Sequence, residues 1–319
     1  MDVIQSMKLG EKETLELIEA AADEHTDVLI TPSVFPSGNE IIAFVSSLNV
    51  KTVLLFPCVP VLPDNYDVCV FSSGVFRGNK CAPILIAGAD AVTDDEFAGF
   101  ISKNRFCELV VLFAECALPF LYGHCRGFGL ISELRACVPF YLHLTAVFAE
   151  NIGGCENIFL RFFGCENAVA MGKKQRTRVV PCDTLTARGT FYRTADECEK
   201  YMTVKKAVFF PTRRHAEEFS AFMLRRGSCC PVFHGGKSPE EKRDAAGIFT
   251  QSANGIIAVT KSFIPTALFL LPFKPLFCGM PPDIRLLEQI TAGDENKDGI
   301  FCVYSSEDIK TALRIRNAQ

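Results

Sequence analysis

The chain has 319 residues and a formal net charge of −4, and 49% of its residues are hydrophobic while 22% are charged. This composition predicts a globular protein with room for two domains, and it excludes a disordered chain and a simple basic nucleic-acid coat. Residues 1–10 have no basic start followed by an apolar core, and no apolar run reaches about 18 residues, so we expect neither a signal peptide nor a membrane helix. The expected location is cytoplasmic, or elsewhere inside the cell at the nucleoid or nucleus, without membrane contact.

Predicted strands and helices alternate along the first half of the chain. Strands are predicted at 27–30, 51–57, 66–71, 82–87 and 140–147 and in the apolar run that begins at 108, and helices at 11–24, 94–102 and 129–136. The helix at 94–102 opens with three acids, which favour a helix N-terminus. This alternation indicates an α/β fold with a parallel, doubly wound sheet.

The segment 31–40 lies between a predicted strand and an apolar helix start, which is the setting of a phosphate-binding loop. Such a loop needs several glycines, a lysine and a Ser or Thr, because backbone N–H groups and the lysine hold the phosphates. Here Gly38 is the one glycine, no lysine is present, and Pro32 and Pro36 lack N–H groups. A plain strand–helix turn is therefore favoured. The remnants of a nucleotide loop in this segment are Ser33, Ser37 and Gly38.

The apolar run from 108 ends in Ala114-Glu115, at the carboxyl end of a predicted buried strand, where open α/β sheets place their ligands. A nucleotide motor has Asp-Glu at this point, and the Asp helps to hold Mg²⁺. Glu115 alone keeps the residue that orients water, and the alternative is that it only caps a helix or pairs with a base.

The second half differs from the first in charge. Residues 1–172 contain 10 Lys and Arg against 21 Asp and Glu, a net charge of −11, while residues 173–319 contain 23 against 16, or +7. A basic run at 171–178 has no apolar period, so we place the domain boundary there and predict domains at 1–172 and 173–319. The run itself is either a solvated linker or a strip that contacts phosphates.

The second half repeats the alternation. Helices are predicted at 195–202, 215–226, 238–249 and 286–290, and strands at 207–210, 231–234, 255–260 and 299–304. The third helix has a strong start, because Ser238 is a good cap, Pro239 suits the first helical position and two acids follow. The prediction is therefore two α/β lobes in tandem.

The fifteen cysteines include no Cys-x-x-Cys pair, and a chain of this length is not a small disulfide scaffold. We interpret them as reduced, buried side chains of an intracellular protein. The five histidines are scattered along the chain, so no metal site is assigned. They are His25, His124, His143, His215 and His234.

Several short segments, taken in order, resemble the helicase core of the RecQ family within superfamily 2. They are Leu121-Tyr122-Gly123-His124, Leu134-Arg135, Leu144-Thr145-Ala146, Phe233-His234-Gly235-Gly236, Ala258-Val259-Thr260-Lys261-Ser262-Phe263, and the run from Pro281 through Glu288-Gln289 to Asp298-Gly299. The resemblance implies two tandem RecA-like domains with doubly wound parallel sheets. It also implies ATP and Mg²⁺ as cofactors of an active member.

The departures from the RecQ pattern fall on the residues of catalysis. The loop lysine is absent at Phe35-Pro36-Ser37-Gly38, the Asp-Glu-Ala-His box becomes Ala114-Glu115-Cys116-Ala117, and the adenine-reading pair becomes Lys8 and Glu11. Two further motifs become Ile264-Pro265-Thr266-Ala267 and Gln289 to Lys297, without the family's arginines. An arginine finger alone is worth ~10³–10⁵ in rate. The resemblance therefore implies a core that has lost ATP hydrolysis and needs no cofactor, with Glu115 and Gln289 as catalytic remnants.

Three functions stay open at this point. The first is a pseudoenzyme that binds single-stranded or forked DNA, or a protein partner, and the others are an ATP-dependent 3'–5' DNA helicase and a purely structural interaction protein. The nucleic-acid contacts are predicted in the second domain at strand ends and helix starts, and solvated surface is the alternative for each of them. They are Arg213, Arg214, His234, Lys237, Lys242 and Arg243.

Overall fold

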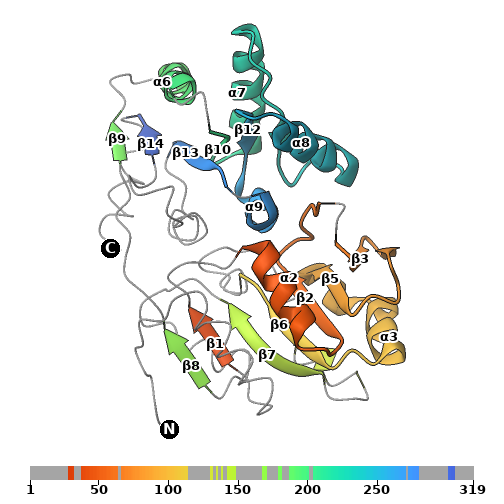
Figure 1. Ribbon diagram of the computed structural model, residues 1–319. Coiled ribbons are helices and arrows are strands. Elements are labelled where there is room, and N and C mark those ends of the chain that lie inside the picture. The colour runs from red at the N-terminus through yellow and green to blue at the C-terminus, as the bar shows by residue number, and fades with distance from the viewer. Residues whose placement is uncertain are drawn as a thin grey trace. The chain divides into compact units, whose positions relative to one another are not determined.

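The computed structural model describes residues 28–31, 37–63, 66–113, 130–131, 134–135, 138, 142–148, 167–170, 179–181, 187–200, 204–270, 272–279 and 301–305. The chain divides into two compact units, Met1–Lys173 and Lys174–Gln319. Figure 1 shows a sheet with helices in each unit, and the two are described separately.

Eight strands of the described residues form one sheet in the first unit. They are β1 (Val28–Thr31), β2 (Thr52–Phe56), β3 (Cys69–Ser72), β4 (Val75–Gly78), β5 (Ile84–Gly88), β6 (Glu108–Val111), β7 (His143–Phe148) and β8 (Asn167–Ala170). Their order is β4-β3-β5-β2-β6-β7-β1-β8. Every pairing is parallel except that of β3 with β4. The sheet therefore has the parallel, doubly wound character that the sequence predicts.

Two helices of the first unit begin with caps that their sequences supply. The α2 helix (Gly38–Ser47) has Ser37 as its N-cap, and α3 (Asp95–Asn104) has Asp94, whose side chain accepts from the N–H groups of Glu96 and Phe97. A short 3-10 turn, η1 (Ala89–Thr93), precedes α3. Side-chain acceptors at this position satisfy N–H groups that have no partner within a helix.

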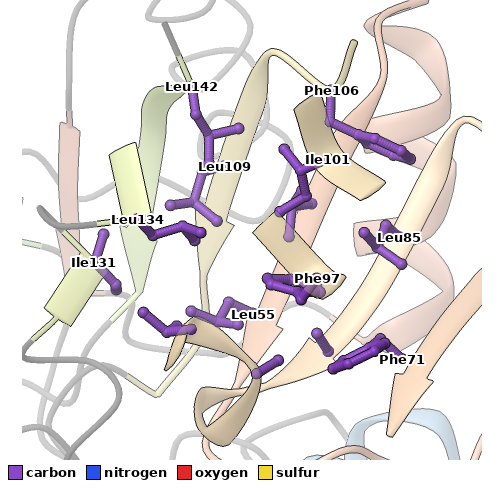
Figure 2. Packing of buried hydrophobic residues seen from close by; sticks show 14 of the residues in the cluster. Leu55, Phe71, Leu85, Phe97, Ile101, Phe106, Leu109, Ile131, Leu134 and Leu142 are labelled. Carbon is purple, nitrogen blue, oxygen red and sulfur yellow. The ribbon is translucent and has the colours of Figure 1, made fainter. Parts of the chain in front are cut away.

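The core of the first unit is built on alternate residues of its central strands. Val53 and Leu55 of β2 and Leu109 of β6 pack with Phe97 of α3 on one face (Figure 2). The alternate residue Leu54 points to the other face and is equally buried. Burial of both faces is the pattern of a sheet that is covered on both sides.

Six strands of the described residues form the sheet of the second unit. They are β9 (Val179–Pro181), β10 (Lys206–Phe209), β11 (Val232–Phe233), β12 (Ile256–Val259), β13 (Lys274–Cys278) and β14 (Phe301–Tyr304). The order is β11-β12-β10-β13-β14-β9, and all pairings are parallel.

Helices cover both faces of this second sheet (Figure 1). The helices are α6 (Ala187–Lys200), α7 (Arg213–Arg225), α8 (Pro239–Gln251) and α9 (Ile264–Leu270), with the 3-10 turn η4 (Lys261–Phe263) before α9. Val208 of β10 packs with α6 and α7, whereas its neighbour Phe209 faces Phe263, with ring centroids 6.2 Å apart. Phe249 of α8 packs near Phe263 on that second face, with their ring centroids 6.5 Å apart.

Some predicted elements differ from the structure. The helix predicted from Ala195 begins eight residues earlier, at Ala187, because the earlier residue Phe191 already packs into the core. Five elements were not predicted at all: β4, β8, β9, α9 and β13. The predicted helices at 11–24 and 286–290 lie outside the described residues, as does half of 129–136. Among the described helices, none is long and apolar enough to cross a membrane.

Candidate nucleic-acid interface

Three neighbouring strands of the second sheet end at one edge, and polar residues follow each of them. The chain continues from β10 into Arg213, from β11 into His234, and from β12 into Ser262. The strand ends are tied together, since the Phe210 N–H donates to the Val259 carbonyl at 2.8 Å and the Thr260 N–H donates to the Phe233 carbonyl at 3.2 Å. Ligands of open α/β sheets bind at this carboxyl edge.

The guanidinium of Arg213 lies against the turn that follows β11. A Cβ placed on Gly236 would lie 3.0 Å from Arg213 Nη1, and one on Gly235 would lie 3.5 Å from Nη2. Two glycines at this point therefore leave the space that the guanidinium fills. Arg213 is exposed, so its donors stay accessible to a ligand.

His234 holds the same turn from inside. Its residue surface is 4% exposed, and its Nδ1 accepts from the Gly236 N–H at 3.0 Å. Since Nδ1 is an acceptor, the proton of the neutral ring is on Nε2, which lies 3.0 Å from Glu217 Oε1 of α7 and donates to it. The sequence predicts a direct polyanion contact for His234, whereas the structure gives both ring nitrogens a partner within the protein.

Two hydroxyls complete this edge. Thr260 Oγ1 and Ser262 Oγ lie 3.2 Å apart, and a Cβ on Gly235 would lie 3.9 Å from Ser262 Oγ. Ser262 and Glu217 were not selected from the sequence. The available signal was the position of Ser262 just after a predicted strand, but the pairing of Glu217 with His234 joins two elements and has no local signature.

The other four predicted cations fall into two classes. Arg214 forms an ion pair with Glu218 one turn along α7 at 2.7 Å, and Lys237, just before α8, forms one with Glu241 at 3.2 Å. Lys242 Nζ instead lies 5.9 Å from the ring centroid of Phe233. Arg243 is exposed and forms no ion pair with another residue that the structure describes. Surface ion pairs of the first kind are worth little and leave the cation accessible.

The two helices that begin at this edge differ in charge at their N-termini. The α7 helix is capped by Thr212, which accepts from the His215 N–H at 3.2 Å, and its first turn has no acid. The α8 helix has a capping box, in which Glu241 accepts from the Ser238 N–H at 2.8 Å. That hydrogen bond is the main cause of a lowered pKa for Glu241. The free positive end of α7 is thus the one suited to an added anion.

In the first unit, the remnant residues of the nucleotide loop belong to a capping box. The Ser37 N–H donates to Glu40 Oε2 at 2.6 Å, and the Glu40 N–H donates to Ser37 Oγ at 3.3 Å. Gly38 is buried at the start of α2. A carboxylate of the chain itself thus occupies the position that an anion would take at this helix end. Ser33, Glu115 and Gln289 lie outside the described residues.

Buried titratable groups lie elsewhere in the second unit. Burial raises the pKa of the Cys198 thiol to about 12 and raises that of Cys230 well above its ordinary value, so these thiols are unreactive. Lys206 is 1% exposed, and burial lowers its pKa, as does the charge of Lys274. Within the described residues, no three His, Cys, Asp or Glu side chains come together as a metal site would require.

The sequence matches no protein-family model and no curated protein. The structure, however, matches solved helicases. The helicase Lhr of Mycobacterium smegmatis, bound to ssDNA and AMP-PNP, gives a TM-score of 0.67 at 13% identity, over 95% of this chain and 48% of that one. The DEAD-box helicase Mss116, bound to ssRNA and UDP-BeF, gives 0.66 at 12% identity, over 96% and 71%. Both comparisons show a shared fold of tandem α/β domains.

A third match extends this result. The helicase MrfA bound to DNA gives a TM-score of 0.60 at 11% identity, over 99% of this chain and 55% of that one. The chain therefore spans about half the length of Lhr and of MrfA. At identities this low, the structural matches establish the fold alone, which is two α/β domains that match tandem RecA-like helicase domains. The prediction of this fold class is confirmed.

Proposed function

We propose that this chain is a RecQ-like helicase core that no longer hydrolyses ATP and that binds single-stranded or forked DNA through its second domain. The proposal rests chiefly on Arg213, whose exposed guanidinium lies against the Gly235–Gly236 turn at the carboxyl edge of the sheet. Arginine presents a planar set of donors that matches the geometry of phosphate.

The chemistry around Arg213 suits an anionic phosphate better than a ligand that lacks negative charge or is apolar. The first turn of α7 adds backbone N–H groups and no acid, and the Ser262 hydroxyl lies near the same Gly235 position that Arg213 approaches. Lys242 and Arg243 add two cations on α8, beside the acids Glu240, Glu241 and Asp244. In this arrangement His234 and Glu217 act as positioning residues, because their hydrogen bonds fix the turn on which Arg213 rests.

Loss of ATP hydrolysis is the second part of the proposal. The helix end that would hold the phosphates already carries the Glu40 carboxylate, 2.6 Å from the Ser37 nitrogen. The sequence also lacks the loop lysine and has Ala114 where the magnesium aspartate stands in the RecQ pattern. Together these changes remove most of the charge stabilisation that phosphoryl transfer requires.

The solved relatives give this proposal its context. Lhr was solved with ssDNA, Mss116 with ssRNA and MrfA with DNA. A core of the same fold that keeps cations at one sheet edge therefore has a surface suited to the same class of polymer. The location we propose is intracellular, in keeping with a nucleic-acid partner.

A salt titration of DNA binding tests the proposal. We expect a fluorescent single-stranded oligonucleotide to bind with a log affinity that falls linearly with log salt. Contacts from Arg213, Lys242 and Arg243 give an expected slope of about −2, at about −0.7 for each phosphate on single strands. A flat slope, or no binding at low salt, would contradict DNA binding and would favour a protein-interaction module, especially if a stable partner co-purified.

A further inference from the structure

The hairpin of β3 and β4 leaves an open edge on the described sheet of the first unit. Among the strands that the structure describes, β4 is the outermost of its sheet and pairs, antiparallel, with β3 alone. Its turn, Ser73-Gly74, has positive φ angles of 52° and 73°, which match the twist of a two-residue hairpin. In an antiparallel edge strand every second residue directs its N–H and C=O groups away from the sheet, where another chain can pair with them.

The hairpin is anchored, so its edge has a fixed shape. Phe76 of β4 stacks on Phe100 of α3 with ring centroids 4.0 Å apart, and it lies 4.6 Å from Phe71 of β3. Val75 and Arg77 point to the opposite face of the strand, where Val75 is 51% exposed and Arg77 is also exposed. The edge thus offers one apolar and one cationic side chain on the same face.

The charge around this edge is opposite to that of its domain. Residues 1–172 carry 21 acids against 10 basic residues, yet the segment 68–89 contains Arg77 and Lys80 and no acid. The nearest acid in sequence before it is Asp67, whose carboxylate already accepts from the Asn79 side chain at 2.8 Å. That amide is neutral, so Asp67 keeps its charge, and an extended segment that pairs with β4 would meet two cations, Arg77 and Lys80, against this one acid.

We propose that the β4 edge binds an extended, acidic segment of a partner protein by strand addition. An acidic side chain of the partner lies opposite Arg77, an apolar one lies beside Val75, and backbone hydrogen bonds continue the ladder. A second copy that pairs through its own β4 fits less well, because it brings another Arg77 and no acid to the positively charged edge. This surface and its partner are separate from the nucleic-acid function proposed above.

The alternative is that Arg77 and the short length of β4 protect the edge against pairing, as charged residues do on many edge strands. The test uses the full chain and fluorescent eight-residue peptides of alternating valine and glutamate. One control peptide has lysine for glutamate, and another is N-methylated at alternate residues, so that it cannot complete a ladder. The protein variants are Arg77→Glu, Arg77→Gln and the control Lys103→Glu, an exposed cation on α3.

We expect the glutamate peptide to bind, and Arg77→Glu to weaken it about tenfold while improving the lysine peptide, since opposite charges across strands attract and like charges repel. Arg77→Gln should fall between these, and Lys103→Glu should change either peptide less than twofold. Equal binding of the N-methylated peptide, no binding of the glutamate peptide, or no dependence on residue 77 would overturn the proposal. An Arg77-dependent dimer of the chain alone would overturn it in favour of self-association.

Discussion

Replacing Arg213 with glutamine tests the role of the sheet edge in the second domain. The substitution removes one cation that lies on the Gly235–Gly236 turn and leaves the other basic residues of α7 and α8 in place. Each phosphate contact on a single strand contributes about −0.7 to the slope of log affinity against log salt. The slope should therefore become about 0.7 less negative. The loss of affinity caused by the substitution should consequently be about fivefold larger at 0.1 M salt than at 1 M salt.

The matched control is Arg225→Gln. Arg225 is an exposed arginine at the other end of the same helix, so the change in net charge is identical. Fluorescence anisotropy with a labelled single strand, titrated at several salt concentrations, gives the slope for each protein. Equal slopes for the two variants would refute a specific contact at Arg213 and would leave only a general effect of net charge.

A second variant perturbs the same contact without changing charge. The variant is Gly236→Ala. Its methyl group would lie 3.0 Å from Arg213 Nη1 and 3.2 Å from the His234 ring, so the guanidinium must shift by a few tenths of an ångström. A smaller loss of DNA affinity than that of Arg213→Gln is expected, with an unchanged salt slope. A loss of affinity as large as that of Arg213→Gln, together with a lower melting temperature, would instead indicate a damaged turn.

Three predictions concern stability. Phe97→Ala should lower the free energy of unfolding of the first domain by about 3–5 kcal/mol, measured by urea denaturation, because Phe97 is fully buried and lies 5.1 Å from the Phe71 ring; a loss below 1 kcal/mol would contradict this core. Gly78→Ala should also destabilise that domain, since φ is +81° and the new Cβ would lie 2.5 Å from the Val68 carbonyl oxygen; an unchanged urea midpoint would show that the hairpin is not as described. Lys206→Met should raise the urea midpoint of the second domain at pH 8. Burial lowers the pKa of this amine in the folded state, so the protonated amine costs stability that the methionine variant does not lose. The gain should shrink as pH rises toward the ordinary lysine value of 10.5, where the unfolded amine also loses its proton, and a gain independent of pH would indicate packing alone.

Much of the fold could be predicted because its signals are local. Asp94 and Ser238 mark helix starts through capping that involves residues two or three positions away, and the structure places caps at both. The segment 263–277 shows the limit of this reasoning. It is apolar almost throughout, so periodicity cannot separate a helix from a strand, and the structure divides it into α9 and β13.

The candidate site was predictable only in part, for a related reason. The positions of Arg213 and His234 just after two predicted strands placed them at a sheet edge, since parallel strands end together. Which strands are neighbours is decided by pairing over long sequence distances. The burial of His234 against Glu217, and the contact of Arg213 with Gly236, depend on that pairing and have no signal in either segment alone.

Steady-state ATP hydrolysis in the presence of saturating forked DNA tests the central proposal most directly. The matched comparison is Glu115→Gln, which removes the carboxylate that the RecQ pattern uses to orient water. We expect the unmodified chain to bind the DNA and to turn over ATP no faster than this variant. DNA-stimulated turnover that Glu115→Gln abolishes would contradict the loss of ATP hydrolysis and establish a working helicase motor.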